Sequence, residues 1–253
     1  MNRKIVLLAG IVLAGTIAVI VHGPIPQPEG YHAFADQRGF FGIPNFWNVV
    51  SNLPFLAVGL AGFFAMRTRP TPGVLPTLRP AYFTFFLGTV LVAFGSGYYH
   101  LAPSDDSLVW DRLPMTIAFM AFLAILIGEQ IGPAIGARLL LPFLAVGLFS
   151  ILYWRLSGDL RPYVLVQFLP MLLAPLLLLL FPSALTRPAL LWGVLVAYAV
   201  AKVFEELDVP IYHVVRGVSG HSLKHIIAAS GTWFLVLAAT GRRVRAGILK
   251  PSP

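Results

Sequence analysis

The sequence of 253 residues contains no cysteine and few charged residues. The lack of cysteine excludes disulfide bonds and thiolate metal ligands, so a transition-metal site would have to use imidazole and carboxylate groups. Charged residues make up 11% of the chain, whereas an average soluble domain carries about 25%. The composition therefore argues against an ordinary soluble domain.

The sequence contains several long apolar runs. Hydrophobic residues make up 58% of the chain, and its mean hydropathy is +0.82. Several runs reach about 20 residues, which is long enough for a helix to cross a bilayer. The runs are continuous, whereas the strands of a membrane barrel alternate apolar and polar residues. The sequence therefore predicts an all-α, polytopic membrane protein.

We expect a seven-helix bundle preceded by an extra hydrophobic helix at residues 4–21. This first run follows Arg3 and Lys4 and lacks a clear cleavage site before His22, which favours a retained helix over a cleaved signal peptide. Segments rich in Pro and Gly separate the later runs. The seven further spans are expected at residues 45–66, 80–101, 108–128, 134–154, 162–181, 188–207 and 221–241.

Three parts of the chain follow from these spans. Residues 1–22 form an N-terminal hydrophobic helix, residues 23–241 a seven-transmembrane domain, and residues 242–253 a basic cytoplasmic tail. The segment 22–44 is rich in Pro and Gly and is expected to form an ordered loop or a short interfacial helix. We find no internal repeat and no second domain.

The distribution of charge predicts the orientation in the membrane. With a cytoplasmic N-terminus, eleven Lys and Arg residues fall on the cytoplasmic side and seven on the other side. Nine of the ten acidic residues lie on the non-cytoplasmic side, and Glu129 is the exception. The protein is therefore expected to span a bacterial inner membrane with both termini in the cytoplasm. The net charge of +8 fits basic flanks that contact anionic lipid, so nucleic-acid binding is not expected.

Three histidines lie at the ends of two apolar runs, on the expected outer side. His100 ends one run, while His221 and His225 begin another and share one helix face because they are four residues apart. Three imidazoles with an open fourth position suit a catalytic zinc ion. Alternatively, His100 caps a helix end at the membrane interface, and His221 and His225 lie at a helix start without a role in metal binding. His213 is the substitute ligand if one of the three does not bind.

Two polar residues near these histidines are candidates for catalysis. Asp111, at the head of the next span, could take a proton from water and deliver it to a leaving group. Ser96, one turn before His100, could donate a hydrogen bond to an oxyanion. Alternatively, Asp111 forms an ion pair with Arg112, or it is an acidic residue at a helix start that the helix dipole favours. The alternative for Ser96 is a small residue that allows close helix packing.

Two other polar segments interrupt the apolar runs. Asn48, Ser51 and Asn52 share one helix face, where hydrogen bonding between helices is the expected role. The segment 202–208 contains four charged residues, too many for contact with lipid. It should therefore face protein or water.

Three motifs occur in order along the chain: Phe-Trp-Asn-Val-Val-Ser-Asn at 46–52, Gly-Ser-Gly-Tyr-Tyr-His at 95–100 with Asp-Arg-Leu-Pro-Met at 111–115, and Gly-His-Ser-Leu-Lys-His-Ile-Ile-Ala-Ala at 220–229. In these motifs and their spacing the chain resembles a bacterial-type member of the alkaline ceramidase family. That family belongs to the superfamily of seven-helix membrane hydrolases that includes the adiponectin receptors.

The resemblance implies a function in sphingolipid metabolism. It implies that His100, His221 and His225 bind zinc, that Asp111 activates water and that Ser96 assists. The reaction would be hydrolysis of the amide bond of a ceramide-like membrane lipid to a long-chain base and a fatty acid. The main alternative is a zinc-containing lipid receptor or scaffold with little turnover. A transporter with a proton relay is a third possibility, although transporter-type repeats are lacking. No protein partner is indicated.

Members of that family carry an acidic calcium-binding segment before the first core helix. The corresponding region here offers mainly Asp36 and Asn45 as candidates for a calcium or structural site. Calcium prefers six to eight oxygen ligands, so this scarcity of oxygen ligands argues against calcium. Arg38 is expected to pair with Asp36 or with another carboxylate instead.

Overall fold

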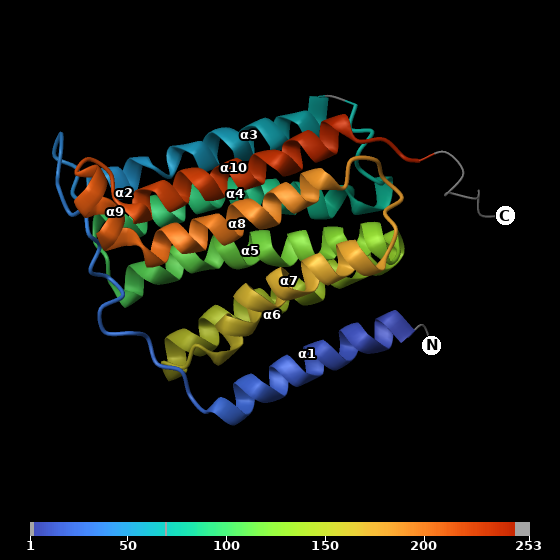
Figure 1. The fold of residues 1–253 in the computed structure, drawn as a ribbon, viewed down its shortest axis with the longest axis horizontal. Helices are drawn as coiled ribbons and strands as arrows, with labels where there is room; N and C mark the ends of the chain where they lie inside the picture. Colours follow the sequence, from blue (N-terminus) through green and yellow to red (C-terminus); the bar gives the residue numbers. More distant parts are fainter. Residues whose placement is uncertain (1–2, 69, 246–253) are drawn as a thin grey trace.

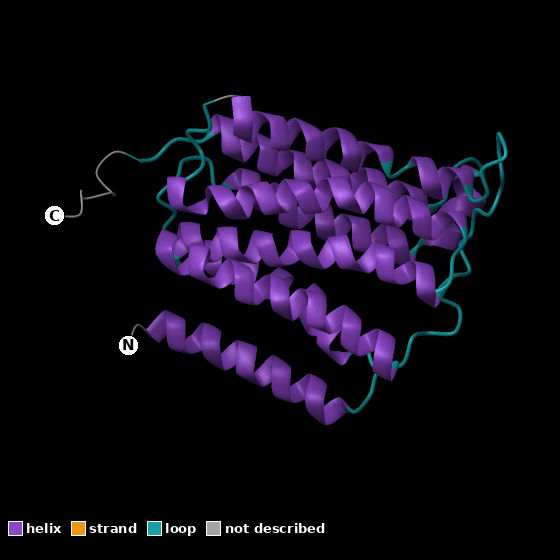
Figure 2. Ribbon diagram, turned by 180° about the vertical axis from the view of Figure 1, so that it is seen from behind, coloured by secondary structure: helices purple, strands orange, loops and turns teal. Residues whose placement is uncertain are grey.

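The computed structural model describes residues 3–68 and 70–245, which are almost entirely helical (Figures 1 and 2). These residues form no β-strand, so the predicted all-α fold is confirmed. The helices are α1 (Arg3–His22), α2 (Phe46–Val50), α3 (Leu53–Thr68), the 3-10 helix η1 (Pro76–Leu78), α4 (Arg79–Leu101), α5 (Asp105–Gln130), α6 (Pro133–Ser157), α7 (Arg161–Leu180), α8 (Ala189–Glu206), α9 (Asp208–Val215) and α10 (Gly220–Gly241).

Within the described residues, seven helical stretches are long and apolar enough to cross a membrane. They are α1, α2 with α3, η1 with α4, α5, α6, α7 and α10. The remaining expected span, 188–207, corresponds to α8. This helix is not among the seven because its last two turns carry Lys202, Glu205 and Glu206. It nevertheless packs along α10 (Figure 1). The composition fits an integral, multi-pass membrane protein.

The first helix, α1, lies at the edge of the bundle and packs against α7 (Figure 1). Only Leu8 of α1 is buried, and Gly15 lies next to Leu169 of α7. Most of its apolar side chains are exposed, as expected of a helix that faces lipid. It is the predicted extra helix, and the remaining long helices form the core.

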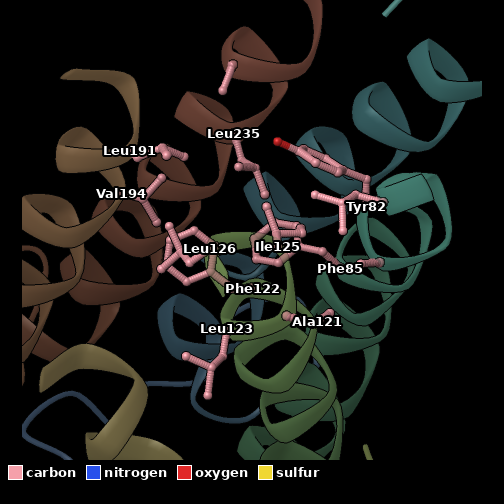
Figure 3. Close-up of a cluster of buried hydrophobic side chains, with 14 of the residues drawn as sticks. Tyr82, Phe85, Ala121, Phe122, Leu123, Ile125, Leu126, Leu191, Val194 and Leu235 are labelled. Atoms are coloured by element: carbon pink, nitrogen blue, oxygen red, sulfur yellow. The ribbon is translucent and has the colours of Figure 1, made fainter. Parts of the chain in front are cut away.

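The core of the bundle is built around α5, the most buried of the long helices. The helices α4, α6 and α7 pack against α5, and side chains of α8 and α10 belong to the same hydrophobic cluster (Figure 3). Members of this cluster include Tyr82, Phe85, Ala121, Phe122, Leu123, Ile125, Leu126, Leu191, Val194 and Leu235.

The expected span 45–66 is divided into two helices by a short turn at Ser51 and Asn52. Pro54 has no N–H for a helical hydrogen bond, and its ring would clash with the carbonyl of Val50, four residues earlier. Proline therefore accounts for the break. The turn leaves Ser51 and Asn52 buried at one end of the bundle.

The end of the bundle where α5 and α10 finish is fastened by a buried ion pair. Arg242 donates two hydrogen bonds of 2.7 Å to Glu129 and one of 2.6 Å to the hydroxyl of Tyr82. Tyr82 also donates to Glu129. Glu129, the one acidic residue on the expected cytoplasmic side, is thus paired inside the protein.

Arg242 is fully buried, although it was expected as the first residue of the basic tail. Residues 1–2 and most of that tail, 246–253, lie outside the described residues. Because α1 starts and α10 finishes at the same end of the bundle, the described structure places the two ends of the chain on one side (Figure 1). Which side is cytoplasmic remains a prediction.

Candidate metal centre

Three histidines meet at the end of the bundle opposite the Arg242–Glu129 pair. His100 lies in the last turn of α4, and His221 and His225 lie in the first two turns of α10. One ring nitrogen from each lies within 4.8 Å of the others, and all three side chains are buried. The structure therefore brings together the three residues predicted as metal ligands.

The closest pair of these nitrogens has the spacing expected of two ligands on one zinc ion. Zinc binds imidazole nitrogen at about 2.0–2.1 Å, so tetrahedral geometry puts two ligand nitrogens about 3.4 Å apart. The Nε2 atoms of His100 and His221 are 3.3 Å apart. Imidazoles also suit several other transition metals, so the three histidines could hold a metal ion, and their geometry does not select one metal.

A hydrogen bond from the α2–α3 turn holds the ring of His225. The hydroxyl of Ser51 lies 2.8 Å from Nδ1 of His225 and 3.2 Å from the carbonyl oxygen of Asn48. A metal bound at Nε2 requires the proton on Nδ1, and Ser51 is placed to accept it while it donates to Asn48. Metal-bound histidines usually have such a partner on their second nitrogen.

The start of α10 is held in place by two oxygen acceptors. The Ser219 side chain accepts a hydrogen bond from the backbone N–H of Ser222, and Asp208 accepts one of 2.7 Å from the N–H of His221. These bonds satisfy N–H groups that the first helical turn leaves unpaired. Asp208 also accepts from the N–H of Ala35, so it connects the loop before α2 to the helix that carries two histidines.

Ser96 and Asp111 lie next to each other because α4 and α5 approach closely at Gly95. A side chain at Gly95 would overlap the carbonyl oxygen of Trp110 on α5. Ser96, the next residue on α4, and Asp111 line one cavity. Close packing is thus the role of the neighbouring glycine, whereas Ser96 lies beside a carboxylate.

A cavity of about 150 Å³ lies beside the histidines and is lined by Ser96, Asp111 and His225. Along α4 the lining continues to Phe85, eleven residues away, which is about 16 Å along a helix. The lining is polar near the histidines and mainly apolar further along. A cavity of this form suits a molecule with a polar group and a hydrocarbon chain.

Charged side chains line the same end of the cavity. Lys224 donates a hydrogen bond of 2.6 Å to Glu205, and Lys202 pairs with the other oxygen of Glu205. Lys202 and Glu205 thus face protein, whereas Glu206 of the same charged segment is exposed.

The loop before α2 covers the histidines from outside the bundle. The ring of Phe34 lies 4.7 Å from that of His100 and 4.4 Å from that of His221, measured between ring centres. Sequence reasoning missed Phe34 and Asp208, and it missed that Ser51 contacts His225. The only sequence signal for Asp208 was its place in a segment too charged for lipid.

Asp36 and Asn45 each have a partner within the protein. Arg38 donates hydrogen bonds of 2.9 and 2.7 Å to the two carboxylate oxygens of Asp36, so the expected pairing is confirmed. Burial raises the pKa of Asp36, but the hydrogen bonds and charge of Arg38 more than offset this effect and lower the pKa. Asn45 donates to the backbone carbonyl of His100. The structure thus accounts for both residues without an ion.

The other polar residues considered in the sequence occupy structural positions. Asn48 donates to the carbonyl of Asp36 and accepts from Ser222 on α10, so the predicted hydrogen bonding between helices is confirmed. His213, the substitute ligand, is exposed on α9 and lies outside the cluster. His32 hydrogen-bonds to Tyr99 and Asp105.

The fold and this site define a helical membrane protein with a buried group of three histidines beside a mainly apolar cavity. The sequence matches the Ceramidase family over residues 42–236, a segment that includes all three histidines, Ser96 and Asp111. The chain therefore belongs to the ceramidase family. No curated protein matches the sequence.

Proposed function

We propose that the protein is a zinc-dependent membrane hydrolase that cleaves the amide bond of a ceramide-like lipid to a long-chain base and a fatty acid. Membership of the ceramidase family supports the reaction class. The observation that carries the proposal is the group His100, His221 and His225 beside Ser96 and Asp111, at the polar end of an apolar cavity.

The three histidines would hold the metal through neutral imidazole nitrogens. Zinc held there would supply a Lewis acid that polarises the amide carbonyl and activates water. Ser51 orients His225, and Asp208 fixes the turn of α10 that carries His221. These contacts would hold the ligand side chains in place for the metal.

Asp111 is placed to hold a proton during hydrolysis. Its carboxylate accepts a proton as the oxygen of water bonds to the carbonyl carbon. It then gives the proton to the amide nitrogen as the C–N bond breaks, so that the amine and the fatty acid are released. Ser96 lines the cavity beside Asp111, and its hydroxyl would donate a hydrogen bond to the carbonyl oxygen as negative charge develops there.

The cavity would hold the hydrocarbon part of the lipid. Its apolar lining along α4 and α5 would bind a chain and place the amide near Ser96 and Asp111, which lowers the entropy cost of reaction. Phe34 would limit the access of bulk water from the loop side.

The test is lipid mass spectrometry on purified protein incubated with ceramide and with mixed membrane lipids, with and without a zinc chelator. We expect zinc-dependent release of a long-chain base and a fatty acid. Asp111→Asn should retain zinc, measured by elemental analysis, and lose about 100-fold or more in rate. Undiminished hydrolysis by His221→Ala would contradict the proposal. Zinc and tightly bound intact lipid without turnover would instead indicate a receptor or scaffold.

A further inference from the structure

Asn52, on the turn between α2 and α3, has an amide whose orientation is set by the backbone. Its Nδ2 donates a hydrogen bond of 2.8 Å to the carbonyl oxygen of Asn48. That bond identifies the nitrogen of the amide and therefore also the oxygen, Oδ1. The side chain is 1% exposed, and Oδ1 has no hydrogen-bond partner among the described residues.

A buried oxygen without a donor requires an explanation, because leaving such a group unpaired is costly. Asn52 lines the cavity together with Ser96, Asp111 and His225. It also directly follows Ser51, which contacts the ring of His225. The unpaired acceptor therefore lies beside the group of residues proposed to carry out hydrolysis.

We infer that Oδ1 of Asn52 accepts a hydrogen bond from the N–H of the substrate amide and so selects secondary amides over esters and N-substituted amides. This inference rests on the proposed function. In a trans secondary amide the C=O and N–H bonds point in opposite directions. A site that directs the carbonyl oxygen to one group of residues therefore needs an acceptor from another segment for the N–H.

Asn52 is the residue that meets this need. The histidines and Ser96 belong to α4 and α10, whereas Asn52 belongs to the α2–α3 turn. Asp111 is another acceptor in the lining, but the proposed reaction needs it for proton transfer. An ester bound in the same way would leave Oδ1 unpaired, and sites that bind a substrate N–H discriminate strongly against analogues without it.

The test compares hydrolysis of a secondary amide lipid and an ester lipid with the same hydrocarbon chains. Asn52→Leu keeps a similar volume and removes the acceptor. We expect its kcat/KM to fall about tenfold or more on the amide and much less on the ester. Thr89→Val is the matched control, because Thr89 lines the same cavity but its hydroxyl bonds only to its own helix, at Phe85. This control should leave the amide-to-ester ratio unchanged.

Equal losses on amide and ester in Asn52→Leu, with an unchanged melting temperature, would overturn the inference. If that variant does not fold, wild-type protein alone tests it with an N-methyl amide of the same lipid. We expect at least about tenfold weaker hydrolysis of the N-methyl amide, and equal hydrolysis overturns the inference while leaving the proposed function intact. Wild-type protein that cleaves no lipid amide at all overturns the proposed function and the inference together.

Discussion

The hydroxyl of Ser51 lies 2.8 Å from Nδ1 of His225, a residue 174 positions further along the chain. The α2–α3 turn thereby holds the ring of a candidate metal ligand. Because the turn lies where Pro54 interrupts the helix, a local break in one span positions a side chain of another.

Ser51→Ala should weaken metal binding without abolishing it. The variant removes the partner of the His225 ring but none of the three candidate ligands, and loss of such a partner typically costs 10- to 100-fold in affinity, so we expect about that loss of zinc affinity. Competition with a coloured zinc chelator measures the change. Ser230→Ala is the control, since Ser230 is exposed on α10, the helix of His225, and its hydroxyl donates to the backbone carbonyl of Ile226. Equal zinc affinity in wild-type protein and Ser51→Ala would show that this hydrogen bond does not support the ligand.

Gly95→Ala should separate Ser96 from Asp111. The added methyl group would overlap the carbonyl oxygen of Trp110, so α4 and α5 must move apart. We expect a loss of stability of about 1–3 kcal/mol, as for other overpacked sites, together with a loss of lipid hydrolysis. Thermal unfolding in detergent and the lipid assay measure the two effects.

Gly97→Ala is the matched control for this prediction. Gly97 lies on the same helix two residues further on, and nothing lies within 4 Å of the position a side chain would take. Alanine favours a helix over glycine by up to about 1 kcal/mol, so this variant should be as stable as wild-type protein or more so. Similar behaviour of the two variants would contradict the close-packing role of Gly95.

The histidine pair could be predicted from sequence because its geometry is local. Four residues of spacing place His221 and His225 on one helix face, and the alternating direction of the spans brings His100 to the same end. Phe34 and Asp208 could not be found in this way, because they reach the site from a loop and from a short helix after the charged end of α8. The burial of Arg242 could not be predicted either, since an arginine followed by Arg243 and Arg245 after the last span has the composition of a basic tail.

Glu129→Gln should destabilise the protein strongly while leaving the histidines in place. It removes the charge that balances buried Arg242, and breaking a buried ion pair on one side typically costs about 3–5 kcal/mol. Chemical unfolding should show this loss, and zinc binding by the folded fraction should be unchanged because the pair lies at the other end of the bundle.

Replacing both partners, with Glu129→Leu and Arg242→Met, should cost less stability than Glu129→Gln alone. Arg138→Gln, at an exposed position, is the control. A larger cost in the double variant would show that the pair itself, rather than its balance of charge, stabilises the bundle.

The lack of cysteine allows a direct test of the predicted orientation, with both termini in the cytoplasm and the histidines near the outer face. Arg138 and Ser157 are exposed near the two ends of α6, and Ser157 is at the end where the histidines lie. A single cysteine can therefore be placed at either end of one helix without any background thiol. In right-side-out vesicles of the bacterial inner membrane, a membrane-impermeant maleimide should label Ser157→Cys and not Arg138→Cys. Inverted vesicles should give the reverse pattern, because they expose the side that carries more Lys and Arg. Labelling of Arg138→Cys alone in right-side-out vesicles would place the histidines on the cytoplasmic side. The substrate would then have to come from the inner leaflet.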